Sequence, residues 1–425
     1  MFKPRISLIH PTSNPNSRNA ALALSEVGLL HEVITTIAYN PQSSATHLLN
    51  LLPSKVSNRI TQELERRTWI PPNGVPIRTH LWQEVLRVAL VKTGLSQHLG
   101  FGQHRPINWV YASLDYHVAN HHLQNLDAVY AYEDGAATTF QAAKQQGILC
   151  LYDLPIPFYR LSQAIQLEEA ERFPELAPAL QAIQEPAWKI ERKEQEVQLA
   201  DHIFVASSFT KKSLLEIGVK PEKISIIPYG APIDYFQPQP KPDNLFRALF
   251  VGRVSPRKGV HYLLEAWQQL QLPEAELLLV GINEFPEVGF AQYREIFRYV
   301  PSVPHASLNQ YYSAANVLVF PSLVEGFGLV LLEAMSCSIP VITTPHTAGI
   351  DILTDGVEGF IVPIRDVEAL KEKLEWCYHH PQELAEMGRA ARRKAEQLNW
   401  QLYRKKLAQC VKNIWNNYTK LQSKR

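Results

Sequence analysis

The chain has 425 residues, more than one ordinary hydrophobic core accommodates, so its length predicts two large domains or three small ones. Lys and Arg together number 42 and Asp and Glu together number 41, and this balance argues against nucleic acid or another polyanion as a partner. No apolar run approaches the roughly 20 residues of a membrane-spanning helix, which argues against an integral membrane protein.

Cysteine spacing and charge distribution predict where the protein works. The four cysteines lie far apart, without a CxxC pair or zinc-ligand spacing, which favours a reducing compartment. The apolar part of the opening MFKPRISLIHP is too short for a signal peptide. Basic residues outnumber acidic ones in residues 1–105, 11 against 5, and in residues 401–425, 7 against none. We expect a cytoplasmic protein, and peripheral attachment to the inner face of the membrane stays open.

Short apolar runs, each followed by a longer helical pattern, recur along the whole chain. This alternation predicts parallel sheets built from strand-helix-strand units. In chain order the predicted strands are RISLIH, HEVITTIA, AVYAY, ILCLYDL, HIFVAS and ISIIP in the first half, then FRALFVGR, AELLLVG, VLVFPS, PVITT and GFIVP in the second. Two successive sheets of this kind predict an α/β protein with two Rossmann-like domains that face each other across a cleft.

A proline-rich segment separates the two sets of strands. Five prolines lie between residues 228 and 242, a density that is typical of a linker. We place the boundary near Phe236, so that the domains are residues 1–236 and 237–400, with the helix 401–425 returning to the first domain. Ligands of doubly wound sheets bind at the carboxyl ends of the strands.

The segment VGRVSPRKGVHYLLEA joins a strand to a helix in the second domain. It places Arg253 at the end of the strand and Lys258 just ahead of Gly259 and the helix. A loop in that position can direct two cations and several amide N–H groups at one anion, and a diphosphate is the natural guest. Solvated loop charges are the alternative reading, and from this motif alone the two are equally supported.

The segment VEGFGLVLLEAMSC follows the next predicted strand and carries two carboxylates eight residues apart, Glu325 and Glu333. Gly326, Phe327 and Gly328 predict a tight turn that lets backbone approach a ligand, and Leu329 begins the helix. Carboxylates accept hydrogen bonds from paired sugar hydroxyls, while a helix start attracts phosphate. For either glutamate alone, an ordinary acidic residue near a helix start is the better interpretation. Together with Arg253 and Lys258 they predict a nucleotide-sugar site.

At this point the chain resembles the retaining GT-B glycosyltransferases of glycosyltransferase family four, the glycosyl transferases group 1 family. The resemblance extends from about residue 191 to residue 400 and includes VGRVSPRKG, the donor-site segment with its two glutamates, DGVEGFIVP and the closing NWQLYRKKL. It implies that the last helix packs on the first domain, that no separate cofactor is needed, and that the partners are a nucleotide-sugar donor and a glycan or lipid-linked acceptor.

Carried over by position, the resemblance implies a role for each matching residue. Arg253 and Lys258 would bind the donor diphosphate. Glu325 would hold the transferred sugar and Glu333 the ribose hydroxyls, with Val303 beside the base. The backbone around sugar and phosphate would come from Gly326, Phe327, Gly328 and Leu329.

The first domain departs from the family pattern at two places. HPTSNPNSRN replaces the usual paired-glycine loop, and Asn16 is our candidate there for contact with the donor phosphates. Tyr152 stands where a His is common. We predict that Asp134 and Asp153 line the acceptor side; helix capping or bonding to loop amides is the alternative for both.

The sequence therefore predicts a metal-independent retaining hexosyltransferase that acts on a cell-envelope, lipid-linked or exopolysaccharide acceptor. No Asp-x-Asp pair is present to hold a diphosphate-bridging metal. LWQEVLRVALV at residues 81–91 is compatible with contact with an anionic membrane surface, but an ordinary buried helix with solvated basic neighbours is the favoured interpretation. The rival functions are a GT-B sugar phosphorylase or epimerase and a non-catalytic nucleotide-sugar-binding protein.

Overall fold

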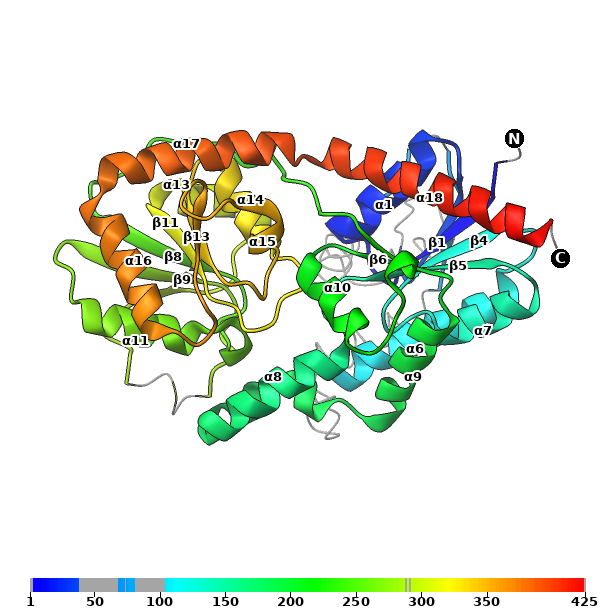
Figure 1. Ribbon diagram of the computed structural model, residues 1–425, viewed down its shortest axis with the longest axis horizontal. Helices are drawn as coiled ribbons and strands as arrows, with labels where there is room; N and C mark the ends of the chain where they lie inside the picture. Colours follow the sequence, from blue (N-terminus) through cyan, green and yellow to red (C-terminus); the bar gives the residue numbers. More distant parts are fainter. Residues whose placement is uncertain are drawn as a thin grey trace, which may run out of the picture. The chain divides into compact units, whose positions relative to one another are not determined.

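The computed structural model describes residues 3–37, 68–72, 74–80, 104–286, 289 and 292–423 (Figure 1). Two compact units divide the chain. The first unit comprises Met1–Asp153, Ala187–Phe204 and Arg404–Arg425, and the second comprises Leu154–Pro186 and Val205–Tyr403. The membrane-facing hypothesis for residues 81–91 lies outside the described residues.

The first sheet contains seven strands within the described ranges, in the order β3-β2-β1-β4-β5-β6-β7. The paired strands β3 to β5 run parallel. Their bounds are β1 Ile6–Ile9, β2 Leu30–Thr35, β3 Ile77–Thr79, β4 Ala128–Tyr132, β5 Leu149–Leu154, β6 His202–Val205 and β7 Ile224–Ile226. Six of the seven coincide with predicted strands. The short β3 was not predicted, because its three residues are intermediate or exposed and leave no apolar run.

The second sheet has six described strands in the order β10-β9-β8-β11-β12-β13, all parallel. Their bounds are β8 Phe246–Val251, β9 Ala275–Val280, β10 Arg298–Val300, β11 Val317–Phe320, β12 Val341–Thr343 and β13 Gly359–Ile361. All residues of β8 are buried, as a strand covered on both faces requires. The edge strand β10 was missed by the sequence pattern, since its first two residues are exposed.

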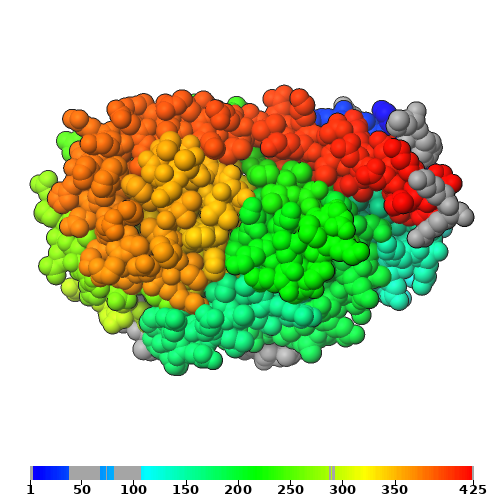
Figure 2. Space-filling model, in the orientation of Figure 1, coloured from blue at the N-terminus to red at the C-terminus, as the bar shows by residue number. Residues whose placement is uncertain are grey.

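Helices connect the strands of both sheets, as the alternating pattern predicted. Those of the first unit are α1 Pro15–Glu26, α6 His104–His121, α7 Ala137–Gln145, α9 Ala187–Leu199 and α18 Trp400–Gln422, which begins in the second unit. Those of the second are α8 Tyr159–Arg172, α10 Ser208–Leu215, α11 Val260–Leu270, α13 Leu308–Ala314, α14 Leu329–Ser336, α15 Gly349–Ile352, α16 Val367–His379 and α17 Pro381–Gln397. The outer faces of α16 and α17, orange in Figure 2, form part of the surface of the second unit.

The change from the first sheet to the second falls between Ile226 and Phe246, around the boundary predicted near Phe236. The division into compact units differs from that boundary, because it assigns residues 154–186 and 205–236 to the second unit. The boundary at Phe236 therefore stays a prediction, as does the cleft between the two sheets.

The last helix, α18, packs against α1 of the first unit. Arg404 forms an ion pair with Glu26 and donates a hydrogen bond to the side chain of Asn19. Near the other end of the helix, the Tyr418 hydroxyl donates to the carbonyl of Gly147. These contacts tie residues 404–425 to the first unit, and Figure 1 shows α18 running alongside α1. In the described part of the chain, no helix combines the length and apolar character that crossing a bilayer demands.

A buried carboxylate anchors α8 within the second unit. Glu169 is fully buried and accepts hydrogen bonds from the His261 ring, the Tyr262 hydroxyl and the Arg365 guanidinium, at 2.6 to 2.8 Å. Burial alone would raise the pKa of Glu169, but the bonds from His261 and Arg365 outweigh it and lower that pKa. Glu169 thereby joins α8 to α11 and to the loop that precedes α16.

Replacing Glu169 with Ala is expected to lower the free energy of unfolding by about 3–5 kcal/mol, because it leaves the Arg365 charge without its buried partner. The neighbouring Glu168 also contacts Arg365, but its side chain is 58% exposed. Glu168→Ala is therefore the matched control and should cost less than about 1 kcal/mol. Chemical denaturation of both variants measures the difference, and equal effects would contradict the anchoring role.

Candidate functional site

The loop between β8 and α11 presents a group of basic side chains. Arg253 lies two residues after β8, and Lys258 ends the short 3-10 helix Pro256–Lys258. The side chain of Arg253 is 53% exposed and pairs with Glu284. Lys258 is almost fully buried, and its ammonium group lies 4.8 Å from the centre of the Phe320 ring. Arg257, between them in the sequence, donates to the carbonyl of Val324 at 2.7 Å.

Glu325, in the connection between β11 and α14, contacts this basic group. Its carboxylate forms an ion pair with Lys258 and lies 3.8 Å from a guanidinium nitrogen of Arg257. It also accepts a hydrogen bond from the amide N–H of Gly326 at 3.2 Å. The structure thus joins two of the residues that the sequence singled out, 67 positions apart along the chain. Glu325 does not cap α14, because Gly328 occupies that position.

The charges of this cluster influence one another. Burial lowers the pKa of Lys258 well below its ordinary value, and Arg257 and Arg253 lower it further. Burial also lowers the pKa of Arg257, to about 10, so Arg257 stays charged at neutral pH. The charge of Glu284 opposes this lowering of the Lys258 pKa, while the Glu325 carboxylate lies in direct contact with the Lys258 ammonium group. A phosphate that took the place of this carboxylate would stabilise the same charge.

The start of α14 is open. Its first cap residue, Gly328, has a left-handed backbone, with φ of 86°, and gives no side-chain cap. Among the described residues, no group accepts from the amide N–H groups of Phe327, Gly328 or Leu329. Gly326 is needed just before them, because a Cβ there would lie 1.8 Å from the carbonyl oxygen of Pro155. Free N–H groups and the helix dipole make this helix start a place for an anion.

Glu333 lies in the same helix and is nearly buried. One carboxylate oxygen contacts the His305 ring nitrogen at 2.8 Å, and the other accepts from the Tyr312 hydroxyl at 2.7 Å. The His305 ring stacks on Tyr235, whose side chain is exposed. The hydrogen bond that the His305 ring donates to Glu333 raises the pKa of His305, and burial opposes this in part. The half-buried Val303 lies in the loop that leads from β10 to His305.

The predicted site residues of the first unit begin in the loop after β1. Asn14 caps α1 by accepting from the amide N–H of Ser17 at 2.8 Å, which explains why this polar segment begins a helix. Asn16 lies in the first turn of α1, and among the described residues no group donates to its buried side-chain oxygen. Its contact with donor phosphates stays a prediction.

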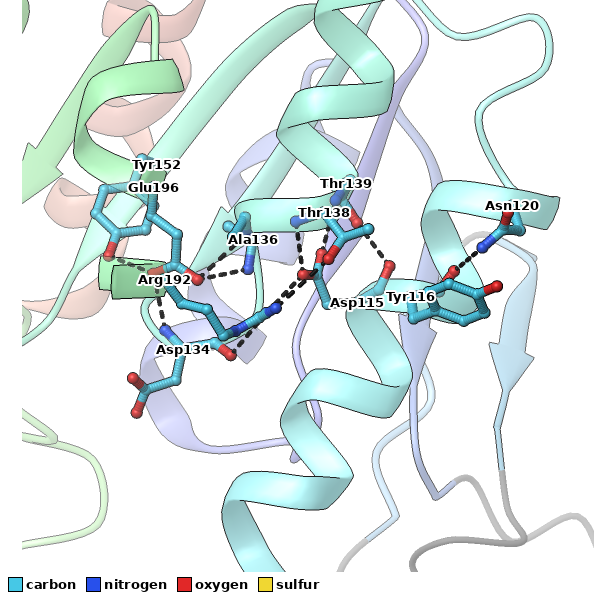
Figure 3. A network of polar contacts seen from close by, with 11 residues as sticks. Asp115, Tyr116, Asn120, Asp134, Ala136, Thr138, Thr139, Tyr152, Arg192 and Glu196 are labelled. Carbon is cyan, nitrogen blue, oxygen red and sulfur yellow. Dashed lines mark hydrogen bonds and ion pairs between the residues drawn. The ribbon is translucent and has the colours of Figure 1, made fainter. Parts of the chain in front are cut away.

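Asp134 lies on a turn just after β4, with a left-handed backbone of φ 70°. Its carboxylate pairs with Lys189 at 3.0 Å, and the preceding Glu133 pairs with Lys193 at 3.2 Å. The amide N–H of Asp134 donates to the buried Glu196 carboxylate (Figure 3). The prediction that Asp134 lines an acceptor site is not tested by these contacts.

Tyr152 and Asp153 lie in buried positions near the end of β5. The Tyr152 hydroxyl donates a hydrogen bond to the buried Glu196 at 2.9 Å, as Figure 3 shows. The family commonly has a His at this position, whereas this chain has an uncharged hydrogen-bond donor. Burial, followed by the Glu196 charge, raises the pKa of Tyr152. Asp153 accepts from the Tyr130 hydroxyl at 2.6 Å, and burial raises its pKa to about 7. Asp153 is only 4% exposed, and its acceptor-side role stays a prediction.

Several partners in both units were not identified from the sequence. Arg257 lies inside the quoted basic motif and could have been found there. His305, Tyr312 and Glu196 had no such signal, because only the folded chain brings them to Glu333 and Tyr152. Within the described ranges, no three His, Cys, Asp or Glu side chains are placed to share a metal ion. Metal independence stays a prediction.

Comparison with known proteins shows similarity in the second unit. Residues 233–394 match the family described as glycosyl transferases group 1, which agrees with the resemblance that the sequence motifs indicated. The D-inositol 3-phosphate glycosyltransferase of Kribbella flavida is 28% identical over 52% of this chain and 58% of its own length. The O-antigen chain mannosyltransferase B of Escherichia coli is 35% identical over 29% of this chain and 34% of its own.

The chain spans about half the length of the curated relatives it matches. Solved structures resemble it over more of its length. Sucrose-phosphate synthase from Thermosynechococcus elongatus has a TM-score of 0.64 at 20% identity and covers 98% of this chain and 100% of its own. Anabaena HepE in complex with UDP-glucose has a TM-score of 0.61 at 15% identity, covering 96% and 100%. These likenesses confirm the predicted α/β fold with two Rossmann-like domains, the GT-B fold.

Arg253 offers the cleanest test of the anion site, because it is exposed and its removal leaves the buried Lys258 and Glu325 in place. Arg253→Ala should weaken binding of inorganic diphosphate on the order of tenfold, the effect of losing one charge-assisted hydrogen bond. Isothermal titration calorimetry measures this. Arg298, also exposed and ion-paired in the same unit, supplies the control, and Arg298→Ala should bind as the wild type does. Equal losses in both variants would argue against a specific site.

Proposed function

We propose that the protein is a retaining glycosyltransferase, which moves a hexosyl unit from a nucleotide sugar to a cell-envelope, lipid-linked or exopolysaccharide acceptor. The observation that carries the proposal is the cluster of Lys258, Arg257 and Glu325 beside the uncapped start of α14. It lies within the segment that matches the glycosyl transferases group 1 family.

The main chemical task in this transfer is to stabilise the leaving group. When the bond between sugar C1 and the diphosphate breaks, the diphosphate keeps the electron pair and gains negative charge. Arg253, Lys258 and the N–H groups at the start of α14 would bind that charge in a partly buried setting, where such interactions are strong. These groups support chemistry without a metal ion. The acceptor hydroxyl would attack C1 from the face that the diphosphate leaves, which retains the configuration, and would pass its proton to the departing diphosphate oxygen.

The two glutamates would hold the two ends of the donor. Glu325, which contacts Lys258, would exchange that contact for hydroxyls of the transferred sugar when the diphosphate binds Lys258. Glu333, further along α14, would accept from the ribose hydroxyls. Tyr235 and His305 form a stacked aromatic pair next to Glu333, and together with Val303 they would lie against the base.

Similar solved structures support the donor class, since those of Anabaena HepE are complexes with UDP and with UDP-glucose. The O-antigen mannosyltransferase among the relatives supports a cell-envelope acceptor. We further propose a cytoplasmic enzyme in peripheral contact with the inner face of the membrane, where such an acceptor would lie. The exposed basic residues of α18, which include Lys405, Lys406 and Lys420, support this placement.

A thermal-shift screen of UDP-, GDP- and ADP-sugars tests the proposal, because the true donor stabilises the folded state by mass action. Glu325→Gln should then lower turnover by about 100-fold or more while donor affinity changes only a few-fold, as expected for a contact that strengthens in the transition state. Glu284→Gln, at the half-buried partner of the exposed Arg253, is the control and should keep most turnover.

The rival functions give different results in the same assays. Release of sugar 1-phosphate in the presence of phosphate would identify a phosphorylase, and a changed donor sugar would identify an epimerase. Donor binding without turnover, with Glu325→Gln fully functional in cells, would identify a non-catalytic binding protein. If no nucleotide sugar stabilises the folded protein, the proposal is rejected.

The His305–Glu333 contact predicts a pH dependence of donor binding. The pKa of His305 is raised above its ordinary 6.5, so the charged contact is complete below pH 6.5 and is lost as pH rises through the raised pKa. Since His305 and the ribose would compete for Glu333, donor affinity should increase several-fold between about pH 6 and pH 8. Titration calorimetry across this range should show a flat profile for His305→Ala.

His379, exposed on α16 of the same unit, provides the matched control. His379→Ala should keep the wild-type increase with pH. If His305→Ala instead binds the donor more weakly at every pH, His305 supports Glu333 and does not compete with the ligand.

A further inference from the structure

The start of α7, in the first unit, is filled by the chain's own carboxylates. Five amide N–H groups donate to two side chains there, and Figure 3 shows most of these contacts. Glu196 accepts from Asp134, Ala136 and Ala137 at 2.9 to 3.3 Å. Asp115 accepts from Thr138 and Thr139, each at 2.8 Å. The methyl side chain of Ala136, the N-cap residue, cannot accept a hydrogen bond, so carboxylates from α9 and α6 cap the helix.

Neither carboxylate is free to leave. Asp115 and Glu196 have no exposed surface, and each has a further partner. Arg192 pairs with Asp115 at 2.6 Å, and the Tyr152 hydroxyl donates to Glu196. A ligand phosphate could reach these N–H groups only by displacing a buried, hydrogen-bonded carboxylate, which is strongly unfavourable.

This arrangement is the opposite of that at α14. Both helices follow a parallel strand at the carboxyl edge of its sheet, which is the usual place for an anionic ligand group. The N–H groups at the start of α14 have no partner among the described residues, whereas those of α7 are all satisfied internally. The start of α14 can therefore bind an anion, whereas the start of α7 cannot.

The groups that remain at the end of β4 are charge-balanced pairs. Glu133 pairs with Lys193, and both side chains are less than 10% exposed. Asp134 pairs with Lys189, and these two are the more accessible, at 22% and 14%. A phosphate that took Lys193 would leave Glu133 buried without its partner. Hydroxyl groups, by contrast, can donate to a carboxylate and accept from an ammonium group without disturbing the charge balance.

We propose that the acceptor group received at this edge of the first unit is an uncharged polyhydroxyl, a sugar residue without phosphate, bound by Asp134 and Lys189. Asp115 and Glu196 act as specificity-determining residues by denying the start of α7 to a phosphate. The inference rests on the proposed function, because only a transferase has an acceptor. It distinguishes this chain from transferases whose acceptor is a phosphorylated sugar or cyclitol.

Transfer assays with matched acceptors test the specificity. With the donor fixed, kcat/KM should be at least about tenfold higher for mannose and glucose than for mannose 6-phosphate and glucose 6-phosphate. Asp134→Asn should raise the KM for the neutral sugar several-fold with a smaller change in kcat, whereas Glu191→Gln, exposed on α9, should change neither. Preference for the phosphorylated sugars would overturn the inference.

A binding experiment decides the matter even if no acceptor is turned over. Inorganic phosphate, compared with chloride at equal ionic strength, should stabilise the wild type and Lys189→Ala equally, because any phosphate site is that of Arg253 and Lys258. A phosphate-dependent shift that is lost in Lys189→Ala and kept in Arg253→Ala would overturn the inference. Failure of all nucleotide sugars to bind would reject the proposed function separately and would leave this comparison valid.

Discussion

The unpaired N–H groups at helix starts are the constraint on which the candidate site depends. Every helix begins with amide groups that no residue of the same helix can satisfy. In this protein α1 uses its own Asn14, α7 uses the buried Asp115 and Glu196, and α14 has no partner among the described residues. The helix start that is left open belongs to the segment that carries Glu325, and it lies next to the buried Lys258.

Paired charges are the second feature that the two units share. Lys258 with Glu325, Arg253 with Glu284, and Asp134 with Lys189 are all in contact in the structure. Such pairs satisfy groups that would be costly to bury alone, and they can exchange their partners for a ligand that carries the same chemistry. The cations of the second unit lie beside a helix start with unpaired N–H groups, so a ligand that replaces their carboxylate partners is expected to be an anion. The ion pairs of the first unit lie beside a helix start whose N–H groups are already bonded, which favours a ligand with hydroxyl groups.

The parallel sheets were predictable from sequence, because strands buried on both faces appear as short apolar runs such as FRALFV and AVYAY. The edge strands β3 and β10 were not, since their residues are largely exposed and hydrogen bonding alone defines them. Among the site residues, Arg253, Lys258, Glu325 and Glu333 could be chosen because turns and helix starts depend on local sequence. Asp153 was chosen by the same reasoning and lies buried against Tyr130.

The sequence by itself determined the strand-helix alternation, the motifs that match the glycosyl transferases group 1 family and the residues at the helix starts of the second unit, because these depend on neighbours within a few positions. Only the tertiary structure decided which side chains meet: Lys258 with Glu325, His305 with Glu333, and Glu196 with the start of α7. Contacts over 28 to 67 residues depend on how helices pack on a sheet. No local pattern records that packing, so whether a helix start is open or closed could be learned only from the folded chain.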